Sequence, residues 1–262
     1  MSSKAFRIAR MIFLASFALS SAAWAATCSN ASLNGTYGFL HSGTASDGTP
    51  IAGLSQLAFD SSTATYTGED TQSHNGVITT EPLTATYAVA PNCTVIATVT
   101  VGGNPPQNLA FVVTSTGFFS TVQRTGVTTE GFALRQGSPT CTNAGVAGSF
   151  GFEATGVFVA GAPAIGPVAF IGELKLTVNS SGDGVITGEI AGSEDGTIFT
   201  FAEEPVIGSY AVAPDCTGSA TIKAKGGSEV HFSLVVVDGG KEVLAIETDP
   251  DTVVSGTLVK GT

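Results

Sequence analysis

The chain has 262 residues, of which 43% are hydrophobic and only 12% are charged, and its formal net charge is −11 at pH 7. Soluble globular domains carry about 25% charged residues, and this chain has Gly, Thr, Ser and Ala in their place. The hydrophobic content argues against a disordered chain, and the composition argues against a helical bundle or coiled coil. The acidic balance argues against binding to nucleic acid, which depends on clustered Lys and Arg.

Residues 1–25 have the pattern of a secretory signal peptide. Three basic residues precede a short apolar segment, and Ala23-Trp24-Ala25 supplies the small residues before a cleavage site after Ala25. The apolar segment is shorter than the about 20 residues that span a bilayer, and the residues before Cys28 fit a lipoprotein anchor poorly. We therefore expect an exported protein, secreted or periplasmic, with no transmembrane anchor after cleavage.

The rest of the chain consists of one sequence unit that occurs twice. Residues 87–94 read YAVAPNCT and residues 210–217 read YAVAPDCT, while GTYGF at residues 35–39 corresponds to GSFGF at residues 148–152. Agreement at this many ordered positions indicates an internal duplication. The predicted domains are a signal peptide over residues 1–25, a first β-barrel unit over residues 26–136 and a second over residues 137–262.

The four cysteines follow the duplication. Four cysteines allow three pairings, and the equivalence of the units selects Cys28–Cys93 and Cys141–Cys216, one disulfide inside each unit. Export permits disulfides, and each would stabilise the fold by up to about 4 kcal/mol in the chain-entropy model. Zinc binding is the alternative, but no Cys-x-x-Cys spacing is present and the three His do not cluster in the sequence. We therefore expect no metal.

Short strands joined by Gly-rich turns are predicted throughout both units. In the second unit Val168, Phe170, Leu174 and Leu176 share one parity, which is typical of a half-buried strand. Strands in the first unit are predicted near residues 35–44, 51–59, 63–69, 82–90, 93–101, 108–115, 117–124 and 129–135. This pattern predicts an all-β fold of two tandem eight-stranded antiparallel β-barrels, because closing a barrel removes both sheet edges. Two β-sandwiches are the alternative.

The order of these strand and turn motifs resembles a known family. Gly35-Thr36-Tyr37-Gly38-Phe39, Phe59-Asp60-Ser61-Ser62 leading to Thr67-Gly68, Thr86-Tyr87-Ala88-Val89 and Cys93-Thr94 are similar to exported bacterial proteins built from small calycin-like or allene-oxide-cyclase-like barrels. The resemblance spans each unit and rests on turn and strand features. It implies a fold rather than an activity, since most members of such families have no assigned function.

Few residues carry chemistry, and the sequence contains neither a nucleophile elbow nor a phosphate-binding loop. His41 shares a strand face with Tyr37 and would be a polar group in an apolar cavity if that face lines the barrel. Arg124 and Glu130 would orient a polar ligand if both pointed inward. The candidate ligand-binding residues are therefore Tyr37, His41, Arg124 and Glu130, and no catalytic residue is assigned. A strand-end histidine and charges that reach water are the alternative interpretation.

These observations favour a non-enzymatic exported protein that acts as a structural, surface or small-ligand-binding module. A small apolar ligand is the partner that an eight-stranded barrel would hold, and nothing in the sequence indicates a cofactor. An enzyme of the cyclase or isomerase type, acting on a small apolar substrate inside the first barrel, is the alternative.

Overall fold

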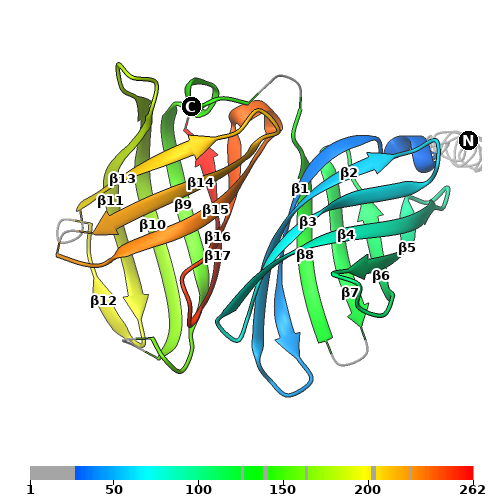
Figure 1. The fold of residues 1–262 in the computed structure, drawn as a ribbon, viewed down its shortest axis with the longest axis horizontal. Helices are drawn as coiled ribbons and strands as arrows, with labels where there is room; N and C mark the ends of the chain where they lie inside the picture. The colour runs from blue at the N-terminus through cyan, green and yellow to red at the C-terminus, as the bar shows by residue number, and fades with distance from the viewer. Residues whose placement is uncertain are drawn as a thin grey trace, which may run out of the picture.

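The structure is a computed structural model that describes residues 27–124, 127–137, 141–162, 165–201, 205–224 and 226–261. It contains two closed eight-stranded antiparallel β-barrels that lie side by side (Figure 1). The predicted all-β fold of tandem barrels is therefore confirmed, and the sandwich alternative is wrong. The predicted signal peptide lies outside the described residues.

The first barrel is an up-and-down meander in which each strand pairs with the next and β8 returns to β1. The closing pair places Tyr37 opposite Arg135 and His41 opposite Gly131. All eight predicted strands overlap strands of the structure, with ends that differ by up to five residues, as at β3 and β4. The strands are β1 (Gly35–Ala45), β2 (Pro50–Asp60), β3 (Thr65–His74), β4 (Val77–Val89), β5 (Thr94–Val101), β6 (Gln107–Val113), β7 (Gly117–Arg124) and β8 (Val127–Arg135).

The second barrel repeats this arrangement and is closed by pairing of β10 with β11. A short additional strand, β12 (Thr197–Phe199), pairs with β11. The barrel strands are β9 (Gly148–Phe158), β10 (Gly166–Val178), β11 (Gly184–Glu194), β13 (Pro205–Val212), β14 (Thr217–Ala224), β15 (Glu229–Val237), β16 (Glu242–Glu247) and β17 (Thr252–Lys260).

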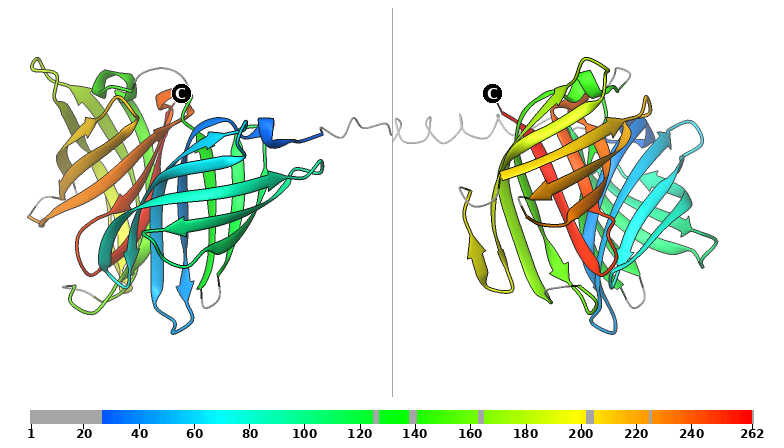
Figure 2. Two further views of the ribbon diagram at one scale, coloured as in Figure 1. Left: turned by 45° about the vertical axis from the view of Figure 1, so that its right-hand side comes forward. Right: turned by 60° about the vertical axis from the view of Figure 1, so that its left-hand side comes forward.

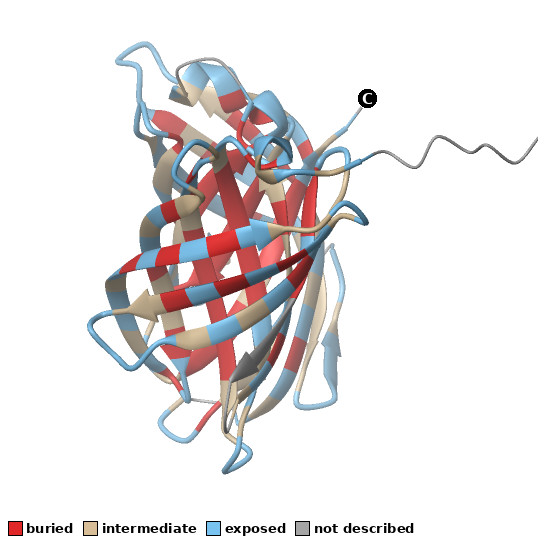
Figure 3. Ribbon diagram, turned by 90° about the vertical axis from the view of Figure 1, so that its right-hand side faces the viewer, coloured by how far each residue is buried: buried red, intermediate tan, exposed pale blue. Residues whose placement is uncertain are grey.

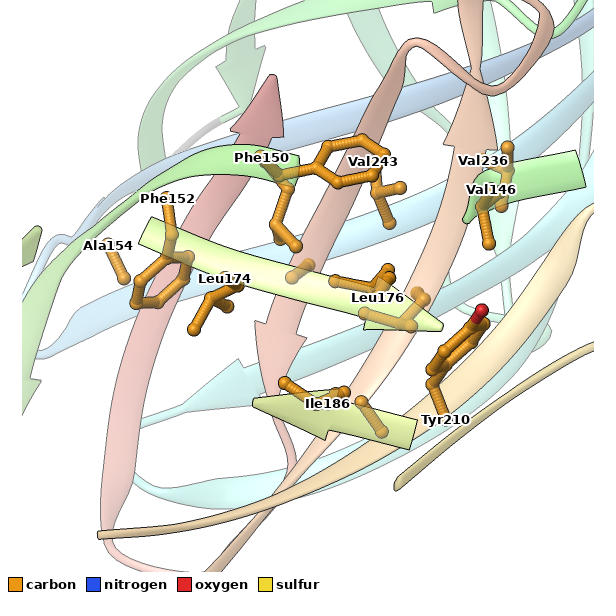
Figure 4. Close-up of a cluster of buried hydrophobic side chains, with 14 of the residues drawn as sticks. Val146, Phe150, Phe152, Ala154, Leu174, Leu176, Ile186, Tyr210, Val236 and Val243 are labelled. Carbon is orange, nitrogen blue, oxygen red and sulfur yellow. The ribbon is translucent and has the colours of Figure 1, made fainter. Parts of the chain in front are cut away.

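Alternation of side chains along the strands separates the barrel interiors from solvent. On β4 the side chains of Leu83, Ala85 and Tyr87 are buried, whereas Thr84 and Thr86 between them are exposed. Figure 3 shows the same alternation of buried and exposed positions on other strands of the first barrel. The interior of the second barrel is filled in part by a cluster of apolar side chains from β9, β10, β11 and their neighbours (Figure 4).

The duplicated motif at residues 87–94 and 210–217 seals one end of each barrel. Tyr87 donates a hydrogen bond to the carbonyl of Leu33, next to the 3₁₀ helix η1 (Asn30–Ser32), at 3.0 Å. Tyr210 does the same to Asn143, the first residue of η2 (Asn143–Val146), at 2.8 Å. The motif therefore fixes a short plug over the end of each barrel.

A disulfide ties each plug to the barrel wall. The structure contains Cys28–Cys93 and Cys141–Cys216, the pairing expected from the duplication. Cys93 and Cys216 both adopt a left-handed backbone conformation, with φ of 68° and 73°, in the turn that the motif forms. At the opposite end of each barrel, the described parts of the connecting loops form no such plug.

The two barrels pack through apolar side chains on their outer surfaces. Strands β1 and β2 of the first barrel contact β15, β16 and β17 of the second, and β17 lies against the first barrel in the views of Figures 1 and 2. The buried residues of this interface are Leu40, Ala52, Leu54, Val159, Val235, Val237, Leu244, Ile246 and Val253. Each of these strands has two apolar faces. One face points into the interior of its own barrel, and the other packs against the neighbouring barrel.

The interface requires a glycine at position 38. A Cβ atom on Gly38 would lie 2.7 Å from Val237 Cγ1 and 2.8 Å from Val235 Cγ1, closer than carbon atoms pack. We expect Gly38→Ala to lower the free energy of unfolding by about 1–3 kcal/mol, because the barrels must move apart or distort. Urea denaturation followed by circular dichroism measures this loss.

The equivalent glycine of the second barrel provides a matched control. A Cβ atom on Gly151 would meet no atom closer than Val259 O, at 3.9 Å. Gly151→Ala is therefore expected to change stability by only a few tenths of a kcal/mol. Equal losses for the two variants would contradict the role of Gly38 in close packing of the barrels.

Candidate functional site

The interior of the first barrel contains a cavity of about 490 Å³ toward the end that carries no plug. This volume lies within the range of about 300–1,000 Å³ that is usual for small-molecule pockets. Its deep wall is largely apolar and aromatic, and its mouth is polar. The wall includes Phe39, Ile51, Leu57, Phe59, Tyr66, Leu83, Val99, Leu109, Phe111 and Phe118, and the mouth includes Asp47, Gln72, His74, Glu81, Asn104 and Gln107.

Three buried polar side chains interrupt the apolar wall. Asp70 Oδ1 lies 3.2 Å from His41 Nε2 and accepts a hydrogen bond of 2.7 Å from Ser55 Oγ. Ser55 and Asp70 are direct register partners on β2 and β3, and all three residues are less than 9% exposed. The His41 ring also stacks on Phe39, with ring centroids 5.1 Å apart.

The electrostatics of this group keep Asp70 ionised. Burial alone would raise the pKa of Asp70, but the charge of His41 and the hydrogen bonds from His41 and Ser55 together lower it below its ordinary value. A carboxylate at Asp70 fixes the hydrogen of the imidazole on Nε2. The other ring nitrogen, Nδ1, is then available to accept a hydrogen bond in the neutral ring or to donate one in the protonated ring.

Glycines on both neighbouring strands make room for the His41 side chain. The register partners of His41 are Gly53 on β2 and Gly131 on β8. A Cβ atom on Gly53 would lie 2.2 Å from His41 Nε2, and one on Gly131 would lie 2.9 Å from His41 Cβ. The imidazole therefore passes over β2 to reach Asp70 on β3, which is possible only because position 53 lacks a side chain.

Two residues that line the cavity have buried polar atoms without a hydrogen-bond partner among the residues that the structure describes. These atoms are His41 Nδ1 and Thr129 Oγ1, and both are shielded from solvent. Thr129 is 4% exposed and lies on β8. Its register partner on β1 is Gly43, two residues from His41, so Thr129 and His41 are diagonal neighbours across the two strands. An unmade buried hydrogen bond costs free energy, so these two atoms offer unused hydrogen-bonding capacity in the wall of the cavity.

The second barrel shows that the fold does not need these polar groups. The strand registers place Ala154, Gly172 and Ile190 at the positions of His41, Ser55 and Asp70. In the same way, Val254 stands at the position of Thr129, with nearly the same shape but no hydroxyl. The polar set is therefore a property of the first barrel alone.

The structure places the four residues predicted as ligand-binding in different environments. His41 lines the cavity. Tyr37 is buried toward the plugged end, where Arg135 lies 5.6 Å from its ring centroid. Glu130 is exposed on the outer face of β8, and the Arg124 side chain lies outside the described part of the structure. Only His41 is thus shown at the cavity.

Ser55, Asp70 and Thr129 were not among the residues predicted from the sequence. Asp70 and Ser55 meet His41 through the registers of three strands, which single-strand alternation does not reveal. A signal was nevertheless present, since each of the three has an apolar or glycine counterpart in the second unit. Comparison of inward positions between the two units would have singled them out.

The order of hydrogen bonds in this group does not match that of a hydrolytic triad. In a serine nucleophile site the histidine stands between serine and carboxylate and removes the serine proton. Here the carboxylate of Asp70 stands in the middle, and Ser55 donates to Asp70 rather than to His41. The arrangement therefore orients His41 and does not activate Ser55.

No group of three or more His, Cys, Asp or Glu side chains in the described ranges is arranged to hold a metal ion. Helices of the length and apolar character needed to cross a bilayer are not found among the residues that the structure describes.

Comparison with known proteins identifies no family for this chain. No protein-family model matches it, and no curated protein matches it. Among solved structures, a DUF3598-family protein of unknown function from Nostoc punctiforme is similar at 10% identity and a TM-score of 0.27, over 88% of this chain and 97% of that one. A β-barrel-like protein of domain of unknown function DUF1849 from Brucella abortus is similar at 12% identity and a TM-score of 0.19, over 87% and 97%. At these TM-scores and sequence identities, the similarity supports no conclusion about function.

Measurements of the free energy of unfolding test whether the fold depends on the polar group of His41, Ser55 and Asp70. Asp70→Ala should lower the free energy of unfolding by about 3 kcal/mol, because it leaves His41 and Ser55 buried without their partner. The combination His41→Ala, Gly53→Phe, Ser55→Gly and Asp70→Ile reproduces the side chains of the second barrel, where Phe170 stands at the position of Gly53. We expect this combination to lose less stability than the single change, as measured by urea denaturation. A larger loss for the combination would mean that the fold itself requires the polar group.

Proposed function

We propose that this protein is exported and that its first barrel binds a small, mainly apolar molecule with one hydroxyl group, without chemical conversion. The observation that supports this most directly is the cavity of about 490 Å³ with unpaired hydrogen-bonding atoms on His41 and Thr129. The second barrel has the same architecture with apolar side chains at these positions. A buried polar group that the barrel architecture does not require is best explained by a ligand that pairs with it.

The chemistry of the two unpaired atoms favours a hydroxyl group. Nδ1 of His41 accepts a hydrogen bond in the neutral ring and donates one in the protonated ring, and the Thr129 hydroxyl can do both. A ligand hydroxyl, which also donates and accepts, satisfies both atoms in either state of the imidazole. Because both atoms are shielded from solvent in the structure, we expect a small rotation of these side chains as the ligand enters. The aromatic wall would hold the apolar part.

Export is supported by two independent features. Residues 1–25 have the charge and apolar pattern of a signal peptide, and the two disulfides suit an oxidising, extracellular compartment. A non-enzymatic role is supported by the hydrogen-bond order around Asp70, which leaves Ser55 without an activating base. The calycin-like resemblance of the sequence agrees with a ligand inside a barrel.

Binding can be tested by calorimetric titration of the delipidated protein with 1-octanol. We expect saturable binding to the wild-type protein and an affinity roughly five- to tenfold lower in Thr129→Val, which keeps the shape of the side chain but removes the hydroxyl. His41→Leu should weaken binding similarly. The NMR signals of the His41 ring should shift when octanol binds.

Ser120→Ala is the matched control for these variants. Ser120 is 4% exposed and its hydroxyl also lacks a partner, but it does not line the cavity. Octanol affinity should therefore be unchanged in this variant. Absence of octanol binding, or equal affinities in wild-type protein and Thr129→Val, would contradict the proposed site.

The export prediction has its own measurement. When the full chain is expressed in a bacterial host with a secretory pathway, the protein recovered outside the cytoplasm should begin at Ala26, because the small residues before that position form the cleavage site. Mass spectrometry of the intact protein gives the first residue. Recovery of the full-length chain in the cytoplasm would contradict export.

A further inference from the structure

The second barrel contains a larger cavity with different chemistry. Its volume is about 770 Å³, and like the first it lies toward the end without a plug. Much of its apolar lining is aromatic, supplied by Phe152, Phe158, Phe170, Phe199 and Phe232. The polar group of the first barrel does not line this cavity, and the ligand proposed for the first barrel is independent of it.

A carboxyl group lies in the wall of this cavity. Glu247, the last residue of β16, is 5% exposed and is the register partner of Phe232 on β15. Carboxyl groups are rarely buried unless they are paired, and no ion pair to Glu247 is found among the described residues. In the first barrel the strand registers place Val122 at the equivalent position. The fold therefore does not require a carboxyl group here.

The surroundings of Glu247 add negative rather than positive charge. The other acidic residues that line the cavity are Glu194, Glu229, Asp249 and Asp251, and no described lining residue is Lys, Arg or His. From outside the cavity, His231 lies 2.8 Å from Asp249 and Lys223 lies 3.9 Å from Glu229. Burial, followed by the charges of Asp249 and Glu194, raises the pKa of Glu247 to about 7, although a side-chain hydrogen bond from Thr252 acts in the opposite direction. The cavity thus combines an apolar wall with a carboxyl group that has no Lys, Arg or His side chain beside it among the described residues.

We propose that the second barrel binds an apolar molecule that carries an amine, with its ammonium group on Glu247 and its apolar part against the phenylalanine side chains. An ammonium ion supplies a positive charge that no described residue places beside Glu247, and in a site of low polarity this pair is stronger than in water. The aromatic rings contribute apolar contact and face a cation favourably. The two barrels would then take ligands of similar apolar character that differ in their polar group.

Calorimetric titration with octylamine at pH 8 tests this proposal on the full protein. We expect octylamine to bind the wild-type protein and to bind Glu247→Gln at least tenfold more weakly, because the substitution keeps the shape but removes the charge. Glu173→Gln removes an equal charge from the exposed face of β10 in the same barrel, and should bind octylamine as the wild-type protein does. The affinity for 1-octanol should be the same in all three proteins.

The Glu247→Gln variant is expected to fold. Because the pKa of Glu247 is raised in the folded protein, stability falls as the pH rises from 4.5, the ordinary value, to about 7, where the buried group ionises. At pH 8 the variant should therefore unfold at a higher temperature than the wild-type protein, and this advantage should shrink toward pH 5. Absence of octylamine binding to the wild-type protein, or equal octylamine affinity in Glu247→Gln, would overturn the proposal while leaving the octanol site of the first barrel untouched.

Discussion

Closure of each eight-stranded sheet onto itself is the constraint from which the other features of this molecule follow. A closed antiparallel barrel has no free edges, so every strand must place one set of side chains inside and the other outside. One end is then sealed by a short plug, a tyrosine hydroxyl and a disulfide, in the same way in both barrels. Any ligand chemistry is thereby confined to the interior near the opposite end.

The duplication provides an internal comparison that separates the needs of the fold from those of a site. Positions that maintain the barrel are the same in both units, as Tyr87 and Tyr210 show at the plugged ends. Positions that face the cavities differ in chemistry: His41, Ser55 and Asp70 in the first barrel have Ala, Gly and Ile counterparts, and Glu247 in the second has a valine counterpart. Buried polar groups are costly, and these differences therefore point to two interiors with different binding chemistry.

Much of the fold could be predicted because its determinants are local. Two-residue alternation and Gly-rich turns located all eight strands of the first unit, and the duplication determined the disulfide pairing. The site could be predicted only at His41, because Asp70 and Ser55 meet it through cross-strand registers and glycine gaps at Gly53 and Gly131. The contact between barrels was also missed, since an apolar outward face such as that of Val235 and Val237 gives no sign of what covers it.

A crystal structure of the exported protein, purified from its natural source without delipidation, tests the central claim most directly. The account predicts electron density for a bound molecule in the cavity of the first barrel, with an oxygen atom within hydrogen-bond distance of His41 Nδ1 and Thr129 Oγ1. A first barrel whose interior is filled by its own side chains, with both atoms paired inside the protein, would contradict it.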